Sequence, residues 1–186
     1  MKVEPFSVLS VSILGQVLLA PQSGYSLKRM FEETAMGHFS SSPGAIYPAL
    51  QRMERAGWIQ GEVENPKALR ARRVYRLTKQ GRAILKALFE TPLTRDDIIH
   101  RMDLVLLRFA FMTSLAGRPA TVAYLRDLAG LLETYVRELK RQSDQLAHAP
   151  LEGVLALQHG IESYKTSLNW ARSSLRKLQA AKSKIS

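Results

Sequence analysis

Residues 40–78 read SSSPGAIYPALQRMERAGWIQGEVENPKALRARRVYRLT, and this stretch decides the fold. Its first part predicts a helix with clear end signals. Ser42 can accept a hydrogen bond from a free first-turn N–H, Pro43 suits the first helical position, and Gly57 suits the left-handed residue after the end. Apolar side chains recur every three to four residues and predict a buried stripe formed by Ile46, Leu50 and Met53.

Pro48 is the one residue that conflicts with this helix, because it removes a backbone donor from the helix interior. It should either kink the helix or mean that regular helix begins nearer Tyr47.

Two alternating runs follow the helix and predict a β-hairpin. Residues 58–64 and 73–77 alternate apolar and polar side chains, and Asn65-Pro66 between them is a turn signal. The alternation places Ile59, Val63, Tyr75 and Leu77 on the inward face. It places Gln60, Glu62, Val74 and Arg76 on the outward face.

The hairpin is strongly basic at its turn and on its second strand. Residues 65–82 contain no acid and seven basic residues, namely Lys67, Arg70, Arg72, Arg73, Arg76, Lys79 and Arg82. Such a cluster attracts backbone phosphates, and arginine at a hairpin tip also suits a narrow minor groove. A merely solvated turn is the less favoured interpretation, because a run this one-sided is unusual on an ordinary surface.

The outer face of the helix carries small and hydrogen-bonding side chains: Ser41, Ser42, Gly44, Ala45, Gln51, Arg52 and Arg55. Glutamine and arginine suit base edges, and small residues near the helix start let the backbone approach phosphate. Read alone, this is an ordinary surface helix. Its place between a short helix and a basic hairpin favours DNA recognition.

The flanking segments complete an N-terminal domain that we place at residues 1–91. Helices are predicted over residues 7–19, ended by Pro21, and over residues 25–33, after a Ser23-Gly24 turn. A further helix over residues 79–89 begins after Thr78.

Residues 92–186 read as a second, all-helical domain. A helix over residues 96–112 ends at Gly117-Arg118-Pro119, and a long amphipathic helix follows over residues 122–146. After Ala149-Pro150, apolar residues at steps of three and four form a coiled-coil-like seam: Val154, Leu157, Ile161, Tyr164, Leu168, Ala171, Leu175 and Leu178. Two long helices around a short break imply an antiparallel hairpin, and its leftover apolar surface calls for a second copy of the chain. Within the seam, we expect the dimer contacts at Leu157, Ile161, Tyr164, Leu168, Ala171 and Leu175.

Composition narrows the function classes. The net charge of +11 favours polyanionic partners, and the absence of cysteine excludes disulfides and thiol chemistry and fits a reducing, cytoplasmic location. No uninterrupted apolar run reaches membrane-spanning length, so we expect no membrane partner. The four histidines lie far apart and there is no phosphate-binding glycine loop or nucleophile elbow. We therefore expect no catalytic residues, no metal site, no cofactor and no enzymatic activity.

Three segments carry a family resemblance. Residues 9–32 (LSVSILGQVLLAPQSGYSLKRMFE), 41–59 (SSPGAIYPALQRMERAGWI) and 72–85 (RRVYRLTKQGRAIL) resemble the PadR family of transcriptional regulators. The C-terminal half is similar to the longer-tailed members of that family, most visibly at residues 161–164 and 168–170. The resemblance also accounts for Pro48, because the family tolerates a proline there.

The resemblance implies a mainly α fold with a small β-hairpin: an N-terminal winged helix-turn-helix followed by an α-helical antiparallel dimerisation domain. It implies a homodimer on an inverted-repeat operator in double-stranded DNA, usually a repressor released by a small, often aromatic, effector. On the matching positions, it implies DNA contacts from Tyr25, Lys28, Ser42, Pro43, Gly44, Tyr47, Gln51, Arg52, Arg70, Arg72 and Arg73. Ser41, on the same helix face, joins this set. The wing loop over residues 65–71 lacks the glycines common in the family, so the resemblance leaves its conformation open.

Two further hypotheses remain open from the residues. The aromatic side chains of the second half are expected in the core, but Phe109, Tyr124 and Trp170 are candidates for an effector cleft where the two domains meet. The alternative to a sequence-specific regulator is a helical protein-interaction adaptor, in which the basic half is only a non-specific nucleic-acid tether. The sequence does not identify the operator, the regulated genes or the effector.

Overall fold

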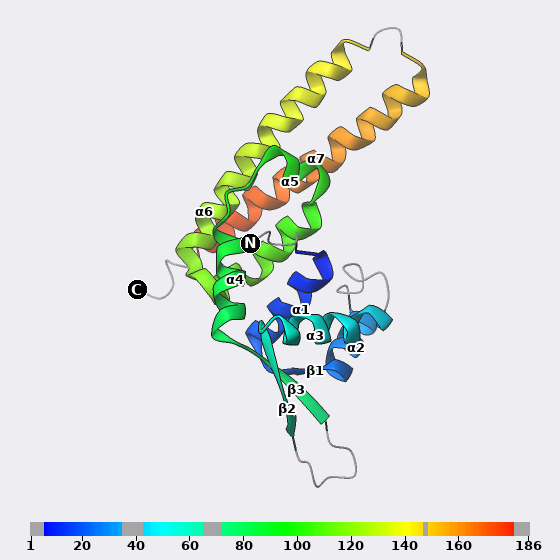
Figure 1. The fold of residues 1–186 in the computed structure, drawn as a ribbon. Helices are drawn as coiled ribbons and strands as arrows, with labels where there is room; N and C mark the ends of the chain where they lie inside the picture. The colour runs from blue at the N-terminus through cyan, green and yellow to red at the C-terminus, as the bar shows by residue number, and fades with distance from the viewer. Residues whose placement is uncertain (1–5, 35–42, 65–71, 147–148, 181–186) are drawn as a thin grey trace. The chain divides into compact units, whose positions relative to one another are not determined.

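The computed structural model describes residues 6–34, 43–64, 72–146 and 149–180. It is mainly helical, with one small antiparallel sheet (Figure 1). The chain divides into two compact units. The first unit comprises Met1–Thr91 with Asp103–Ala116, and the second unit comprises Pro92–Met102 with Gly117–Ser186. A single boundary at residue 92 does not give this division, because residues 103–116 group with the first unit.

Three helices of the first unit begin at side-chain caps. In α1 (Val8–Leu19) the Ser7 hydroxyl accepts from the Ser10 N–H, and in α4 (Lys79–Glu90) the Thr78 hydroxyl accepts from the Gly81 N–H. In α2 (Gly24–Glu33) Ser23 and Ser26 form a reciprocal capping box. Each cap satisfies backbone donors that the first helical turn leaves without partners.

The helix predicted after residue 42 has two parts. A 3-10 turn, η2 (Pro43–Ala45), leads into α3 (Ile46–Arg55), and Pro48 is the third residue of α3. At that position the missing N–H would have had no partner within the α-helix, so the proline is tolerated there. Gly57 follows the helix with φ 72°, as predicted. The predicted cap Ser42 lies outside the described residues, and Ala45 at the N-cap makes no side-chain cap bond.

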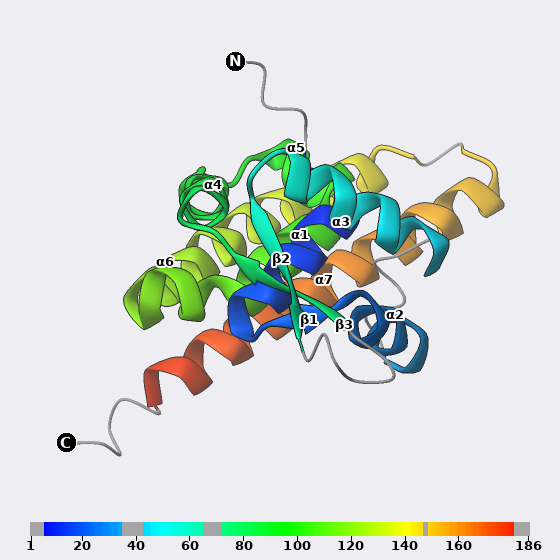
Figure 2. The same cartoon turned by 60° about the horizontal axis from the view of Figure 1, so that its bottom comes forward.

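The predicted hairpin is present as β2 (Ile59–Glu64) and β3 (Arg72–Leu77), in antiparallel register from Ile59 opposite Leu77 to Glu64 opposite Arg72. A third strand, β1 (Gln22–Ser23), was not predicted. It pairs with β3, which gives the order β1-β3-β2 (Figure 2).

The inward and outward faces of the hairpin were partly mispredicted. Val74 was expected to point outward but is only 4% exposed, because β3 is the central strand and both α1 and α2 also contact it. Val63 was expected to point inward but is 50% exposed, since it lies near the free end of the edge strand β2.

The first turns of α6 (Met102–Asp144) complete the core of the first unit. The ring of Phe111 lies directly against Gly15 of α1, where a Cβ atom would collide with it. Arg108 is 5% exposed, and its guanidinium donates to the carbonyl oxygen of Phe89 at 3.0 Å and to that of Thr91. These bonds satisfy carbonyl groups at the end of α4.

The helix predicted over residues 96–112 is interrupted, which corrects that prediction. α5 (Arg95–His100) starts at a Thr94–Asp97 capping box and ends at Arg101, whose φ and ψ of −136° and 32° are not helical. α6 then begins at Met102. The predicted break at residues 117–119 is present, because Gly117 adopts φ 80° and ψ 169° inside α6.

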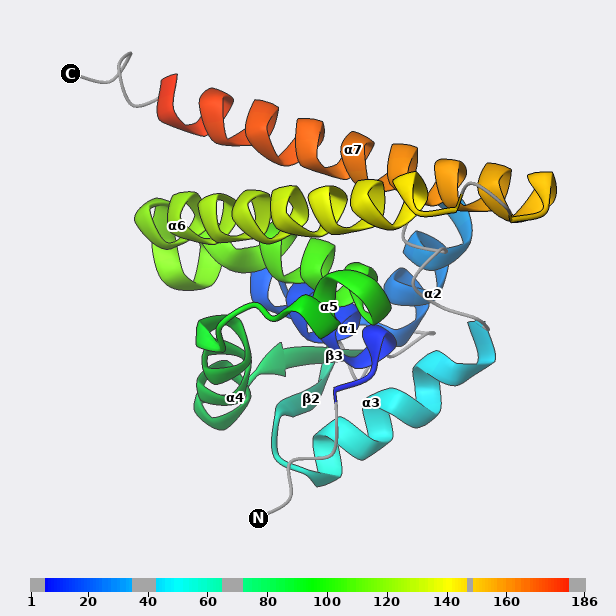
Figure 3. The ribbon, with the colours of Figure 1, turned by 90° about the horizontal axis from the view of Figure 1, so that it is seen from above.

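In the second unit, the later part of α6 packs antiparallel to α7 (Leu151–Ala180), as the hairpin prediction required (Figure 3). Arg118 donates to the carbonyl of Leu178, and Arg172 forms an ion pair with Glu133 at 2.8 Å. Nearer the hairpin end, the rings of Tyr135 and Tyr164 meet edge to face at 4.8 Å. None of the helices in the described ranges is long and apolar enough to cross a membrane.

Candidate nucleic-acid interface

One face of α3 is exposed and carries the predicted base-reading side chains. Ile46, Ala49, Leu50 and Met53 are at most 2% exposed and fix the helix on the first unit. The opposite stripe is exposed and consists of Gly44, Tyr47, Pro48, Gln51, Arg52 and Arg55. Glutamine and arginine are the side chains that pair most readily with base edges in the major groove.

A concave surface lies beside this stripe, between α2, α3 and β3. It encloses about 930 Å³ and brings together four of the predicted DNA-contacting residues, namely Tyr25, Tyr47, Arg72 and Arg73. Tyr25 is 66% exposed and Tyr47 is 48% exposed, so both phenol rings are available to a partner. Lys28 lies on the same helix as Tyr25 and forms an exposed ion pair with Glu32 at 3.7 Å.

Gly24 determines where Tyr47 lies. A Cβ atom at Gly24 would lie 2.6 Å from Cε1 of Tyr47 and 3.4 Å from Cδ1 of Leu50. The absence of a side chain at the start of α2 therefore lets the Tyr47 ring rest against that helix. The two helices are thereby held close together at this surface.

The arginines of β3 are paired with carboxylates, which the sequence count did not anticipate. Arg72 contacts Glu64 at 2.9 Å, and Arg76 lies 3.9 Å from Glu62 and 3.8 Å from Glu64. No acid lies within residues 65–82, but the antiparallel register places the acids of β2 beside the arginines of β3. The run of seven basic residues therefore overstates the free positive charge of the wing.

Arg73 is paired differently, with a carboxylate of α3. Its Nη2 donates to Oε1 of Glu54 at 2.7 Å, and its guanidinium lies 6.0 Å from the centre of the Tyr75 ring. The hydrogen bond from Arg73 holds the pKa of the Glu54 carboxyl below its usual value, and the same bond raises the pKa of Arg73. Burial raises the pKa of the Tyr75 phenol.

Several predicted contact residues cannot be placed. Ser41, Ser42 and Arg70 lie outside the described residues, as does the wing loop over residues 65–71. Pro43 begins the 3-10 turn before α3, and Gly44 follows it in an exposed position. Their proposed contacts stay predictions.

The predicted dimer contacts are partly buried within the chain. Ile161, Leu168 and Ala171 are at most 7% exposed, whereas Leu157, Tyr164 and Leu175 are half-buried. The apolar surface still open along the seam is therefore smaller than the sequence pattern alone indicates.

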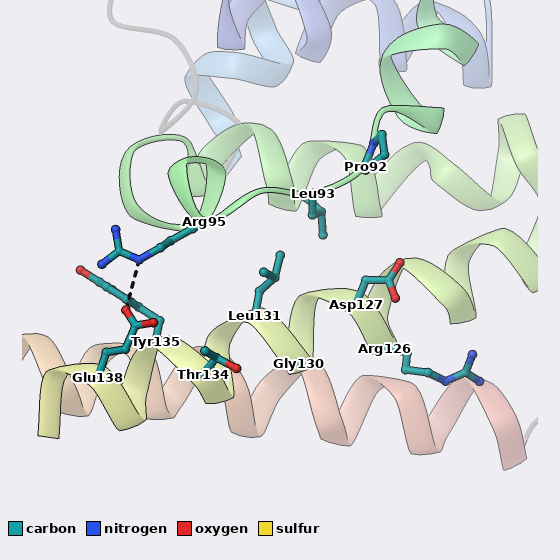
Figure 4. A pocket seen from close by; sticks show the side chains of 10 residues that line it. All are labelled: Pro92, Leu93, Arg95, Arg126, Asp127, Gly130, Leu131, Thr134, Tyr135 and Glu138. Carbon is teal, nitrogen blue, oxygen red and sulfur yellow. Dashed lines mark hydrogen bonds and ion pairs between the residues drawn. The ribbon is translucent and has the colours of Figure 1, made fainter. Parts of the chain in front are cut away.

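The three residues of the predicted effector cleft do not line either cavity that we describe. Tyr124 is 6% exposed, and Phe109 and Trp170 are half-buried. A cavity of about 480 Å³ lies instead within the second unit, between the Pro92–Arg95 segment and α6 (Figure 4). Leu93 and Leu131 line its middle, and Arg95 closes one side by contacting Glu138 at 3.2 Å and lying 4.9 Å from the centre of the Tyr135 ring. This cavity was not predicted, because Pro92 was interpreted only as a domain boundary. The described residues contain no cluster of potential metal ligands.

Comparison with known proteins identifies the first unit. Residues 13–87 match the transcriptional regulator PadR-like family. The chain carries a PadR-like domain. The sheet and the helices α1 to α4 are thus a PadR-like winged helix-turn-helix, with α3 as its recognition helix and the β2–β3 hairpin as its wing. The family consists of transcriptional regulators that bind DNA. No curated protein resembles the chain closely enough to count as a match.

Solved structures of PadR proteins are also similar over most of the chain. PadR from Bacillus subtilis in complex with operator DNA is 21% identical, with a TM-score of 0.44, and the match covers 92% of this chain and 99% of that one. The PadR-like transcriptional regulator BC1756 from Bacillus cereus is 26% identical, with a TM-score of 0.41 and coverages of 93% and 99%. The Bacillus subtilis protein in complex with p-coumaric acid is 22% identical, with a TM-score of 0.41 and coverages of 95% and 98%. Because these TM-scores are below 0.5, the likeness is too weak to transfer a property of those proteins to this chain.

Proposed function

We propose that this PadR-like regulator binds DNA sequence-specifically, as a homodimer on an inverted-repeat operator, and represses transcription. The proposal of sequence-specific binding rests on the exposed stripe of α3 formed by Tyr47, Gln51 and Arg55. This stripe lies next to the concave surface bearing Tyr25 and Arg72. In this arrangement α3 enters the major groove while α2 and the wing contact the backbone. The open part of the α7 seam supports the homodimer.

Binding measurements on an operator and on random duplex DNA test this division of labour. The operator is first obtained by genomic footprinting. Gln51→Ala or Arg52→Ala should lower the preference for the operator by about 1–3 kcal/mol if the side chain pairs with a base edge, whereas Arg72→Ala should weaken binding to both duplexes alike. An equal loss on operator and random DNA for the α3 variants would contradict base reading by this helix.

A dimer should place two α3 helices in successive major grooves. The protected half-sites are then expected about one helical turn, roughly 10 base pairs, apart. Sedimentation analysis of the full chain gives the mass. A monomer without a discrete footprint would favour the alternative function, a helical adaptor that is only tethered to nucleic acid.

We also propose that a small aromatic compound releases the regulator from its operator, as the family resemblance implies. The candidate place for it is the cavity of the second unit in Figure 4. Footprinting with and without candidate aromatic acids tests release. Leu131→Trp narrows the cavity of Figure 4, so loss of release in this variant, with operator binding intact, would support effector binding there. Unchanged release would contradict it.

A further inference from the structure

Of the three arginines on β3, Arg73 alone forms an ion pair with the recognition helix. The pairs of Arg72 and Arg76 stay within the hairpin, and these two side chains are 69% and 52% exposed. Such exposed ion pairs contribute little to folding stability, and their arginines can readily exchange the carboxylate for another anion. Glu54, the partner of Arg73, lies on the last full turn of α3 and is only 28% exposed. This pair therefore connects two elements of the interface, and its carboxylate is less exposed than that of Glu64, although Arg73 itself is 50% exposed.

The Glu54 carboxylate holds a second strand as well. Its Oε1 accepts the backbone N–H of Gly61 at 2.8 Å, in addition to the guanidinium of Arg73 at 2.7 Å. One oxygen atom thus joins α3 to the edge strand β2 and to the central strand β3. Hydrogen bonds to an ionised acceptor are about twice as strong as neutral ones.

Gly61 provides the space for this arrangement. A Cβ atom there would lie 2.8 Å from Oε1 of Glu54 and 2.9 Å from Cε1 of Tyr75, and it would collide with Nε of Arg73. The Arg73 side chain therefore crosses the hairpin over a residue without a side chain. Gly61, Arg73 and Glu54 fit together as one unit, and Tyr75, which is 7% exposed, forms the surface beneath it.

We propose that Glu54 is a positioning residue for DNA recognition, which fixes the wing to the recognition helix through Arg73 and Gly61. Arg73 then braces the interface and is not a phosphate ligand, in contrast to Arg72. The proposal rests on the proposed DNA-binding function. It predicts that the orientation of the wing, and with it the fit to an operator, depends on a carboxylate that does not touch DNA.

The test measures affinity for operator and random duplex DNA over a range of salt concentrations. We call the contact of Glu54 with Arg73 and Gly61 the brace. Glu54→Gln removes the charge from the brace. Glu64→Gln is the matched control, because it removes a carboxylate from an exposed arginine pair of the same hairpin. Glu54→Gln should lower operator affinity about tenfold, the loss expected for one charge-assisted hydrogen bond, with the salt dependence unchanged. Glu64→Gln should instead raise affinity for both duplexes, because Arg72 no longer has to leave a carboxylate to reach its phosphate, and it should leave unchanged the slope of log K against log salt, to which Arg72 already contributes in the wild type.

Two further variants keep the test decisive. Gly61→Ala displaces Arg73 without changing any charge and should reproduce the Glu54→Gln result. Arg73→Ala should leave the salt slope as in the wild type, whereas Arg72→Ala should reduce it by about 0.9. Thermal unfolding of each variant shows whether the first unit remains folded.

Two outcomes separate the brace from the function on which it rests. If Arg73→Ala reduces the salt slope as much as Arg72→Ala does, Arg73 is a phosphate ligand and the brace is refuted. If the wild-type protein itself does not distinguish operator from random DNA, the proposed function fails first, and the brace loses its role with it.

Discussion

The glycines on α1, α2 and α4 of the first unit lie against atoms of other elements, whereas Gly130, Gly153 and Gly160 on the helices of the second unit face open space. A Cβ at Gly81 would collide with the backbone carbonyl of Trp58, and one at Gly15 would collide with the ring of Phe111. Apart from the adjoining residues and backbone of its own helix, no atom lies within 4 Å of a Cβ built at Gly130, Gly153 or Gly160. The first unit uses glycine to bring neighbouring elements close together. In the second unit Gly130, Gly153 and Gly160 make no such close contact, whereas Gly117 is required by its φ of 80° at the kink in α6.

This difference shows how each unit achieves its shape. The first unit combines short elements, side-chain caps and close backbone contacts, so the α3 stripe and the wing are held in one geometry. The second unit consists mainly of long helices that pack along apolar seams. Substitutions that disturb local geometry should therefore affect the first unit far more than the second. The single tryptophan in each unit, Trp58 in the first and Trp170 in the second, allows the two to be followed separately.

The largest effect is expected from Gly81→Ala. The added methyl group meets backbone atoms of Trp58 that cannot rotate away, so the first unit should lose about 1–3 kcal/mol of stability. Denaturant unfolding followed by Trp58 fluorescence, in a Trp170→Phe background, measures this loss. Gln80→Ala, at an exposed position on the same helical turn, is the control. An unfolding midpoint equal to that of the control would show that the packing around Gly81 can relax.

Removal of helix caps should give the next largest loss of stability, and the loss should be larger in the first unit than in the second. Thr78 accepts from the Gly81 N–H at 2.9 Å and also donates to the carbonyl of Gly57 at 2.6 Å, so Thr78→Ala should cost about 1–2 kcal/mol. Thr94 caps α5 of the second unit in an exposed position, and Thr94→Ala should cost only about 0.5–1 kcal/mol. The same fluorescence assay, with Trp58 or Trp170 as reporter, compares the two. Equal losses would contradict the contrast between the units.

Gly130→Ala should raise folding stability, in contrast to the substitutions above. Gly130 lies inside α6 with open space around it, and alanine favours a helix interior by about 0.5–1 kcal/mol over glycine. The second unit should therefore become more stable, as reported by Trp170 in a Trp58→Phe background. A loss of stability would mean that another chain covers this position in the assembled protein.

The smallest effect concerns pH. Arg73 holds the pKa of Glu54 below its unfolded value, so the stability that Glu54 contributes is present above the unfolded pKa and is lost as the pH falls through the lowered folded value. The groups that face this carboxylate are Arg73, Tyr75 and the Gly61 N–H, and neither Arg73 nor Tyr75 changes charge in acid. As the pH falls from the ordinary carboxyl pKa of 4.5 through the lowered folded value, the stabilities of wild type and Glu54→Gln should converge. A constant difference between them down to about pH 2 would contradict the assignment.

Local signals in the sequence predicted most of the first unit. Gly57, Thr78 and the Ser23-Gly24 turn each mark an element end through their own backbone or side-chain chemistry, so no distant contact was needed to interpret them. β1 was missed because two residues carry no periodic pattern. Val74 was misassigned because its burial depends on β1 and the helices that contact β3, and alternation within a hairpin cannot reveal them.

The candidate site was less accessible to prediction. The residue types on α3 could be interpreted directly, since a helical stripe is a local property. The brace could not be inferred, because Glu54 and Arg73 are 19 residues apart and their contact depends on the register of β2 and β3. The break at Arg101 and the cavity beside Leu131 were not predicted either, because neither produces a pattern in residues that are neighbours in the sequence.

The chain passes between the two units three times, at residues 91–92, 102–103 and 116–117. A gene fragment ending at residue 91 would lack Phe111, which packs on Gly15, and Arg108, which bonds to the carbonyl of Phe89. Recombination at a single point between two relatives would therefore join an N-terminal part to a core segment that did not evolve with it. The DNA-reading half and the start of α6 should accordingly be inherited together, and a regulator with a new operator is more readily obtained by point substitutions on α3 than by exchange of whole modules.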